Sequence, residues 1–175
     1  MAQLSYLDKI RGDKVRSGIA YPKITEILIS GLGGLVIIGL LYFMQSELSF
    51  QTFIIPFGAS AVLVFAAPAA PFSQPRNVVG GHVIAALTGV AVFSIFGQTN
   101  WWVLAIANGV AIALMVATKT VHPPAGATAL IPVLSSIGNF AWPFMPVMLG
   151  AAIIVLVGVI YNNLMPARRY PSFWF

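Results

Sequence analysis

Two histidines stand in long apolar stretches of this sequence, and their side chains have the most distinctive chemistry in those stretches. His82 follows a pair of glycines, and His122 precedes Pro123 and Pro124. Ionisable side chains in membrane-type segments are costly to bury and mark functional sites by default. Each imidazole can line a pore or exchange a proton with a permeating acid. The structural alternative is an imidazole that only hydrogen-bonds a carbonyl group.

Two short motifs place small residues and a hydroxyl group after a proline. Residues 56–61 read Pro-Phe-Gly-Ala-Ser-Ala, and residues 124–129 read Pro-Ala-Gly-Ala-Thr-Ala, at an offset of 68 residues. Because proline is favoured at the first helical position, each motif predicts an extended stretch followed by a short helix. A helix N-terminus presents unpaired N–H groups and a partial positive charge, which suits a small anion. The alternative is that these small residues only let membrane helices pack closely.

Arg76 and Lys119 are charged residues between apolar segments, and each has two interpretations. Either side chain attracts an anion to the mouth of a pore, or it marks the membrane interface. We expect the substrate-binding residues to come from the two motifs and their flanks: Gly58, Ala59, Ser60, Arg76, Asn77, His82, His122, Pro123, Pro124, Gly126, Ala127 and Thr128.

Acidic residues are few, and none falls in a predicted membrane segment. The chain also has no cysteine, so thiolate chemistry is excluded. We see no catalytic constellation and no metal-ligand spacing, and we expect neither an enzyme nor a cofactor. The acids are Asp8, Asp13, Glu26 and Glu47.

The composition indicates an integral membrane protein that is mostly embedded. Of the 175 residues 59% are hydrophobic and 7% are charged, whereas about a quarter of a soluble domain is charged. A spanning helix needs about 20 apolar residues. Several runs without Asp, Glu, Lys or Arg reach that length: residues 27–46, 48–75, 77–118 and 120–167.

The basic residues predict the topology. Seven of the nine Lys and Arg residues lie near the two ends of the chain, which places both termini in the cytoplasm and requires an even number of crossings. The segment Met1–Pro22 is either a short interfacial helix or a solvated tail. We expect a cytoplasmic N-terminal segment at residues 1–23, a transmembrane domain at residues 24–165 and a cytoplasmic tail at residues 166–175.

The transmembrane domain reads as two copies of span, short helix and span. The offset of 68 residues relates residues 24–97 to residues 98–165. If the short segments re-enter, the copies are parallel; if they cross, the copies are inverted and all nine basic residues share one side. We favour the inverted arrangement, with the half-helices meeting near the midplane of an all-α bundle. The expected spans are residues 24–44, 78–96, 101–117 and 142–164, and the short segments are residues 53–67 and 123–134.

Residues 121–130, Val-His-Pro-Pro-Ala-Gly-Ala-Thr-Ala-Leu, resemble the signature of the HPP family of integral membrane proteins, which is named for its His-Pro-Pro motif. Residues 56–63 and 74–82 also resemble that family. The resemblance covers about residues 25–165. Family members in plastids and cyanobacteria are associated with nitrite transport. The resemblance therefore implies nitrite as the substrate and the bacterial inner membrane as the location. The family is usually described with four spans, which differs from six crossings.

The expected function is a channel or secondary transporter for a small monovalent anion. Nitrite is the leading substrate, and nitrate and formate are alternatives. One competing reading is a membrane sensor or scaffold that transports nothing, and another is a pore for neutral solutes. The lipid bilayer is the expected surrounding, nucleic acid is not a partner, and self-association is left open.

Overall fold

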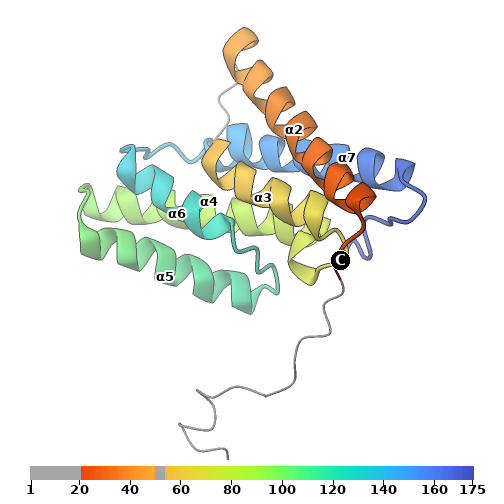
Figure 1. Ribbon diagram of the computed structural model, residues 1–175. Coiled ribbons are helices and arrows are strands. Elements are labelled where there is room, and N and C mark those ends of the chain that lie inside the picture. Colours follow the sequence, from red (N-terminus) through yellow and green to blue (C-terminus); the bar gives the residue numbers. More distant parts are fainter. Residues whose placement is uncertain (1–20, 50–53) are drawn as a thin grey trace, which may run out of the picture.

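The computed structural model describes residues 21–49 and 54–175, and every regular element within them is helical (Figure 1). This confirms the all-α fold class for the described part of the chain. Residues 1–20 of the predicted N-terminal segment lie outside the described residues. The elements in chain order are α2 (Ile24–Glu47), α3 (Ile54–Ala66), η1 (Pro71–Ser73), α4 (Pro75–Phe96), α5 (Trp101–Ala117), α6 (Ala125–Leu134), η2 (Pro143–Met148) and α7 (Leu149–Leu164).

Three helical stretches are long and apolar enough to cross a membrane, namely Ile24–Glu47, Pro75–Phe96 and Pro143–Leu164. They coincide with three of the spans expected from hydropathy. The fourth expected span, residues 101–117, forms the shorter apolar helix α5. The two short segments form α3 and α6, which are also too short to span as straight helices.

The helix of the first proline motif begins at a different residue from the one expected. Helix α3 begins at Ile54, so Pro56 is its third residue rather than its first. The first four N–H groups of a helix have no partner within the helix, so a proline in the first turn costs no hydrogen bond. In the second motif Pro124 is the N-cap of α6, and the expected order of proline and helix holds there.

Helix α4 is the centre of the bundle, and α2 is its most peripheral member. Helix α4 packs against α5, α6, α7 and η2, while α2 packs against α3 and α7. In the most apolar stretch of each helix, half of the residues of α4 are buried, compared with 17% of the residues of α2. Large apolar side chains such as Leu28 and Leu35 on α2 are exposed on the outside, as expected for a surface that faces lipid.

Successive helices run in alternating directions. The colour order in Figure 1 shows α2, α4 and α6 running one way and α3, α5 and α7 the other, with α2 tilted away from the bundle. The start of α2 and the C-terminal residues therefore lie at the same end. The ion pair between Glu26 and Arg168 joins them there. Which side of a membrane this end faces stays a prediction.

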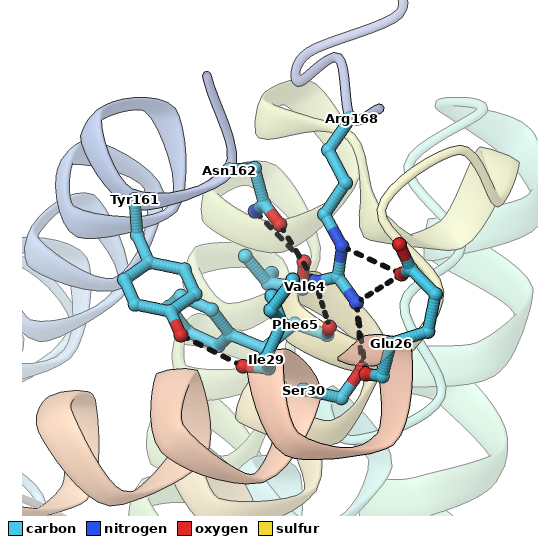
Figure 2. Close-up of polar contacts among 8 residues, drawn as sticks. All are labelled: Glu26, Ile29, Ser30, Val64, Phe65, Tyr161, Asn162 and Arg168. Atoms are coloured by element: carbon cyan, nitrogen blue, oxygen red, sulfur yellow. Dashed lines mark hydrogen bonds and ion pairs between the residues drawn. The ribbon is translucent and has the colours of Figure 1, made fainter. Parts of the chain in front are cut away.

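Arg168 fastens the C-terminal segment to three helices (Figure 2). Its Nη2 atom lies 2.8 Å from Glu26 Oε2 and 2.8 Å from Ser30 Oγ on α2. Its Nη1 atom donates to the Phe65 carbonyl at the end of α3 and to Asn162 Oδ1 on α7. The Arg168 side chain thus links α2, α3 and α7 at this end of the bundle.

The C-terminal segment also docks on the turn between α3 and α4. The Tyr170 hydroxyl donates to the Ser73 carbonyl at 2.8 Å, and the Ser172 N–H donates to Gln74 Oε1 at 2.7 Å. The Tyr170 side chain is 1% exposed. Two residues of the predicted tail, Tyr170 and Ser172, are therefore bonded to the turn that carries Phe72, whereas Phe173, Trp174 and Phe175 are exposed.

Candidate functional site

Four of the sequence-predicted site residues meet in the interior of the bundle. They are Ser60 of α3, His82 of α4, Thr128 of α6, and His122 from the loop between α5 and α6. Ser60, His82 and His122 are each 0% exposed, and Thr128 is 1% exposed. We call these four residues the histidine cluster.

Hydrogen bonds join the histidine cluster into one chain. The Ser60 Oγ atom lies 2.8 Å from Nε2 of His82 and 2.8 Å from Nε2 of His122. The other ring nitrogen of His82, Nδ1, lies 2.8 Å from Thr128 Oγ1. The Nδ1 atom of His122 lies 2.8 Å from the carbonyl oxygen of Phe72.

The Phe72 carbonyl sets the direction of this chain. A carbonyl oxygen only accepts, so Nδ1 of His122 carries the hydrogen, and Nε2 of the neutral ring accepts. Ser60 therefore donates its hydroxyl hydrogen to His122 and accepts from Nε2–H of His82. The remaining acceptor, Nδ1 of His82, takes the hydroxyl hydrogen of Thr128.

Two further contacts border the cluster. The Ser60 hydroxyl lies 3.1 Å from the Pro56 carbonyl, a longer contact than the one to His122, and this carbonyl competes for the same hydrogen. The ring of Phe57 packs edge-on against His82, with centroids 5.2 Å apart. The sequence analysis did not select Phe57 or Phe72, and no spacing signal singles out a backbone carbonyl.

Gly81 allows the loop that carries His122 to lie directly on α4. A Cβ atom at Gly81 would stand 2.7 Å from the Cβ of His122 and 2.8 Å from the Thr120 carbonyl oxygen. Such distances are too short for real contacts, so a larger residue would displace the loop. The absence of a side chain at Gly81 therefore permits the close approach of the two histidine rings, whose centroids lie 4.9 Å apart.

Arg76 and Asn77 hold the same loop but do not reach the cluster. Arg76 Nη2 donates to the Thr118 carbonyl at 2.8 Å, and Asn77 Nδ2 donates to the Val121 carbonyl at 2.8 Å. These contacts tie the first turn of α4 to the segment that precedes His122. In this conformation the two residues position the histidine.

A cavity of about 520 Å³ lies between α5 and α6, and His122 forms part of its wall. Pro123, Gly126 and Ala127 from the second motif also line it, together with Asn108 of α5. The Oδ1 atom of Asn108 is buried and has no hydrogen-bond partner among the described residues. The sequence analysis did not select Asn108; the signal that could have found it is a lone amide in an apolar segment.

The first N–H groups of α6 are already bonded in this conformation. Ala125 donates to the His122 carbonyl, Gly126 to the Pro123 carbonyl and Ala127 to the Pro124 carbonyl, at 2.9 to 3.1 Å. An anion held by these N–H groups would have to replace the turn bonds. Of the two prolines, Pro124 is buried and Pro123 is exposed.

Gly58 and Ala59 lie apart from the histidine cluster. Gly58 lines a separate cavity of about 340 Å³ between α2 and α3, and Ala59 is exposed. The structure therefore brings together the hydroxyl and imidazole groups of the predicted set, while the first motif's glycine faces α2.

Among the described residues, no acidic side chain hydrogen-bonds a member of the histidine cluster. The chain has no Asp or Glu after Glu47, and Glu26 pairs with Arg168. The charged residues nearest in sequence to the histidines are basic, namely Arg76 and Lys119. An excess proton on the cluster would attract an anion from outside the protein.

Comparisons with known proteins agree with the His-Pro-Pro resemblance. The chain matches the protein-family model described as "HPP, transmembrane region" over residues 19–171. It is similar to two curated transmembrane proteins of Dictyostelium discoideum, with 38% and 34% identity over 153 residues. These alignments cover 83% of this chain and 49% and 54% of the relatives, so the chain spans about half their length. No solved structure matches the chain.

Proposed function

Because this chain belongs to the HPP family of transmembrane proteins, we propose that it is a channel or secondary transporter for a small monovalent anion, with nitrite as its substrate. The observation that carries the proposal is the histidine cluster, which is buried in a bundle with membrane-type helices and has no carboxylate partner within the part of the chain that the structure describes. A proton on either ring requires a counter-charge, and a permeating anion supplies it.

The cavity beside His122 is the proposed place for the substrate. Its walls are mostly apolar, with His122 and Asn108 as its polar residues. Small-molecule sites commonly combine an apolar wall with a few placed polar groups. A planar anion such as nitrite, nitrate or formate is small enough to enter such a space with water. The resemblance to nitrite-associated family members favours nitrite.

We also propose that the two repeats are inverted. The alternating helix directions in Figure 1 support this, because α2, α3 and α4 run opposite to α5, α6 and α7 in order. Ser60 and Thr128 hold corresponding positions in the two motifs, and both contact His82. The excess of basic residues near the two ends supports a cytoplasmic location for both, and a bacterial inner membrane is the proposed setting.

The direct test is nitrite uptake into liposomes that contain the purified protein. Nitrate, formate and chloride serve as competitors, and uptake is measured under two opposite pH gradients. We expect uptake above that of empty liposomes, with nitrite the preferred substrate. Absence of uptake of all four anions by folded protein would instead favour a sensor or scaffold that transports nothing.

A second candidate, a pore for neutral solutes, has one observation in its favour. Asn108 Oδ1 accepts hydrogen bonds, has no partner in the described chain and borders an apolar cavity. A carbonyl oxygen suits a neutral hydrogen-bond donor better than an anion. Water and urea permeation without nitrite uptake, measured in the same liposomes, would select this candidate.

A further inference from the structure

We propose that His82, Ser60 and His122 form a relay that holds one excess proton and passes it between the two rings through the serine hydroxyl. The coupling to transport rests on the proposed function: each proton on the relay accompanies one anion. The relay itself rests only on the geometry of the histidine cluster.

The contacts that build the relay are short and continuous. Ser60 Oγ lies 2.8 Å from Nε2 of each histidine, and no other side chain lies between them in the chain of hydrogen bonds. Both Nε2 atoms hydrogen-bond Ser60 Oγ rather than each other, so the hydroxyl is the hydrogen-bonded link between the two rings. A hydroxyl both donates and accepts, which is what a relay requires.

The proton balance of the transfer closes without another reactant. An excess proton enters at Nδ1 of His82, and the Thr128 hydroxyl turns from donor to acceptor. The Nε2–H bond of His82 then breaks as a new O–H bond forms on Ser60. At the same time the original O–H bond of Ser60 breaks and an N–H bond forms at Nε2 of His122. His82 is again neutral, and His122 is an imidazolium.

His122 is the end of the relay. Its Nδ1–H stays on the Phe72 carbonyl, which accepts a hydrogen bond but does not take up a proton. The residue also forms part of the wall of the 520 Å³ cavity. The charged state of the relay is therefore placed beside the proposed anion position.

The relay holds one excess proton at a time, because two imidazolium rings at this distance would repel each other without a carboxylate between them. Among the described residues, no Asp, Glu, Lys or Arg side chain hydrogen-bonds a cluster member. From α3, Phe57 and Ser60 face His82. From α6, Thr128 does so. Arg76 of α4 is bonded to the Thr118 carbonyl.

The first experiment tests the relay without reference to transport. Protein labelled with ¹⁵N-histidine is reconstituted in lipid, and the ring nitrogens are observed by solid-state NMR. We expect His122 as the Nδ1–H tautomer and His82 as the Nε2–H tautomer at high pH, and a single shared proton taken up on acidification. Finding the Nε2–H tautomer at His122, or two independent protonation steps, would overturn the relay.

The second experiment tests the coupling. A pH-sensitive dye inside nitrite-loaded liposomes reports the proton movement that accompanies nitrite. We expect one proton per anion and no response to an imposed membrane potential. Ser60→Ala keeps both histidines but removes the hydroxyl, and we expect proton-coupled uptake to fall by about 100-fold, the scale of one proton-transfer group. Ser60→Thr retains a hydroxyl and is expected to retain coupling.

Thr88→Val is the matched control, because Thr88 is on the same helix as His82 and, among the described residues, its hydroxyl bonds only the Ile84 carbonyl of its own helix. It should leave uptake and the dye response unchanged. Unchanged proton coupling in Ser60→Ala would overturn the relay, and nitrite uptake without proton movement in the wild type would overturn the coupling. If the wild-type protein moves no anion but the two tautomers are as expected, the proposed function fails and the relay stands.

Discussion

Arg168 and Glu26 form an ion pair with their Nη2 and Oε2 atoms 2.8 Å apart, although 142 residues separate them. The Arg168 side chain is 6% exposed; its Nε atom also donates to Glu26 Oε2, and its Nη1 atom donates to the Phe65 carbonyl and to Asn162 Oδ1. The pair joins the two ends of the described chain. The sequence analysis used Arg168 as a basic residue that predicts the topology. In the structure its side chain also holds several helices together.

Replacing Arg168 should therefore destabilise the bundle. We expect Arg168→Ala to lower the free energy of unfolding by about 3 kcal/mol, because it leaves the Glu26 carboxylate and the acceptor oxygens of Ser30, Phe65 and Asn162 without their donor. Arg168→Lys keeps the charge but not the planar fork, and should recover only part of the loss. Thermal unfolding in detergent measures the difference. Arg169→Ala, at the exposed neighbouring position, is the control, and equal effects of the two alanine variants would contradict the prediction.

Gly81→Ala should displace the loop that carries His122. The added Cβ would stand 2.7 Å from the His122 Cβ, so the loop must move, at a cost of about 1–3 kcal/mol. We expect lower thermal stability and lower nitrite uptake together. The control is Gly34→Ala on α2, where a Cβ meets nothing within 4 Å. Wild-type stability and uptake in Gly81→Ala would show that the loop does not pack on α4 as described.

Substitution at Gly126 should separate size from chemistry in the cavity. A Cβ at Gly126 would lie 3.5 Å from Asn108 Oδ1, which is ordinary contact, so Gly126→Ala should be tolerated. Gly126→Leu should fill the space between α5 and α6 and abolish anion flux while the protein stays folded. Gly109→Leu on the exposed face of α5 is the matched control. Full anion flux through a folded Gly126→Leu variant would show that the cavity is not part of the anion pathway.

Tyr170 should make stability fall at alkaline pH. Burial raises the pKa of Tyr170 above its ordinary value, so the folded protein keeps this phenol protonated. An unfolded tyrosine ionises at about pH 10, so the contribution of Tyr170 is fully present below that pH and is lost as pH rises above it. Its hydrogen bond to Ser73 contributes about 1 kcal/mol.

The measurement compares wild type with Tyr170→Phe by thermal unfolding at about pH 8 and about pH 11, on either side of the ordinary tyrosine pKa. The wild type should be more stable at the lower pH, and its advantage should shrink or reverse at the higher pH. Tyr42→Phe, at a position 59% exposed, should show no such change. An advantage that is constant with pH would contradict burial of the hydroxyl.

Much of the architecture follows from local pattern. The runs without charge predicted the long apolar helices, and the start of α5 at Trp101 agrees with expectation. The residue types of His82 and His122 marked them as candidates. These features are predictable because helix hydrogen bonds join residues four apart and lipid exposure selects apolar side chains regardless of the fold.

The side-chain contacts between those helices could not be predicted from the sequence, because they depend on how the helices pack. No pattern in the sequence shows that Ser60 bridges two histidines that lie 22 and 62 residues away, or that a backbone carbonyl at Phe72 sets the direction of the chain. Gly58 and Gly126 hold equivalent positions in their motifs, yet they line different cavities. A motif gives the residue types of each short helix. The rotation of that helix about its own axis, relative to its neighbours, decides which of its side chains contact other residues. That rotation depends on contacts made along the whole bundle, such as the close approach at Gly81.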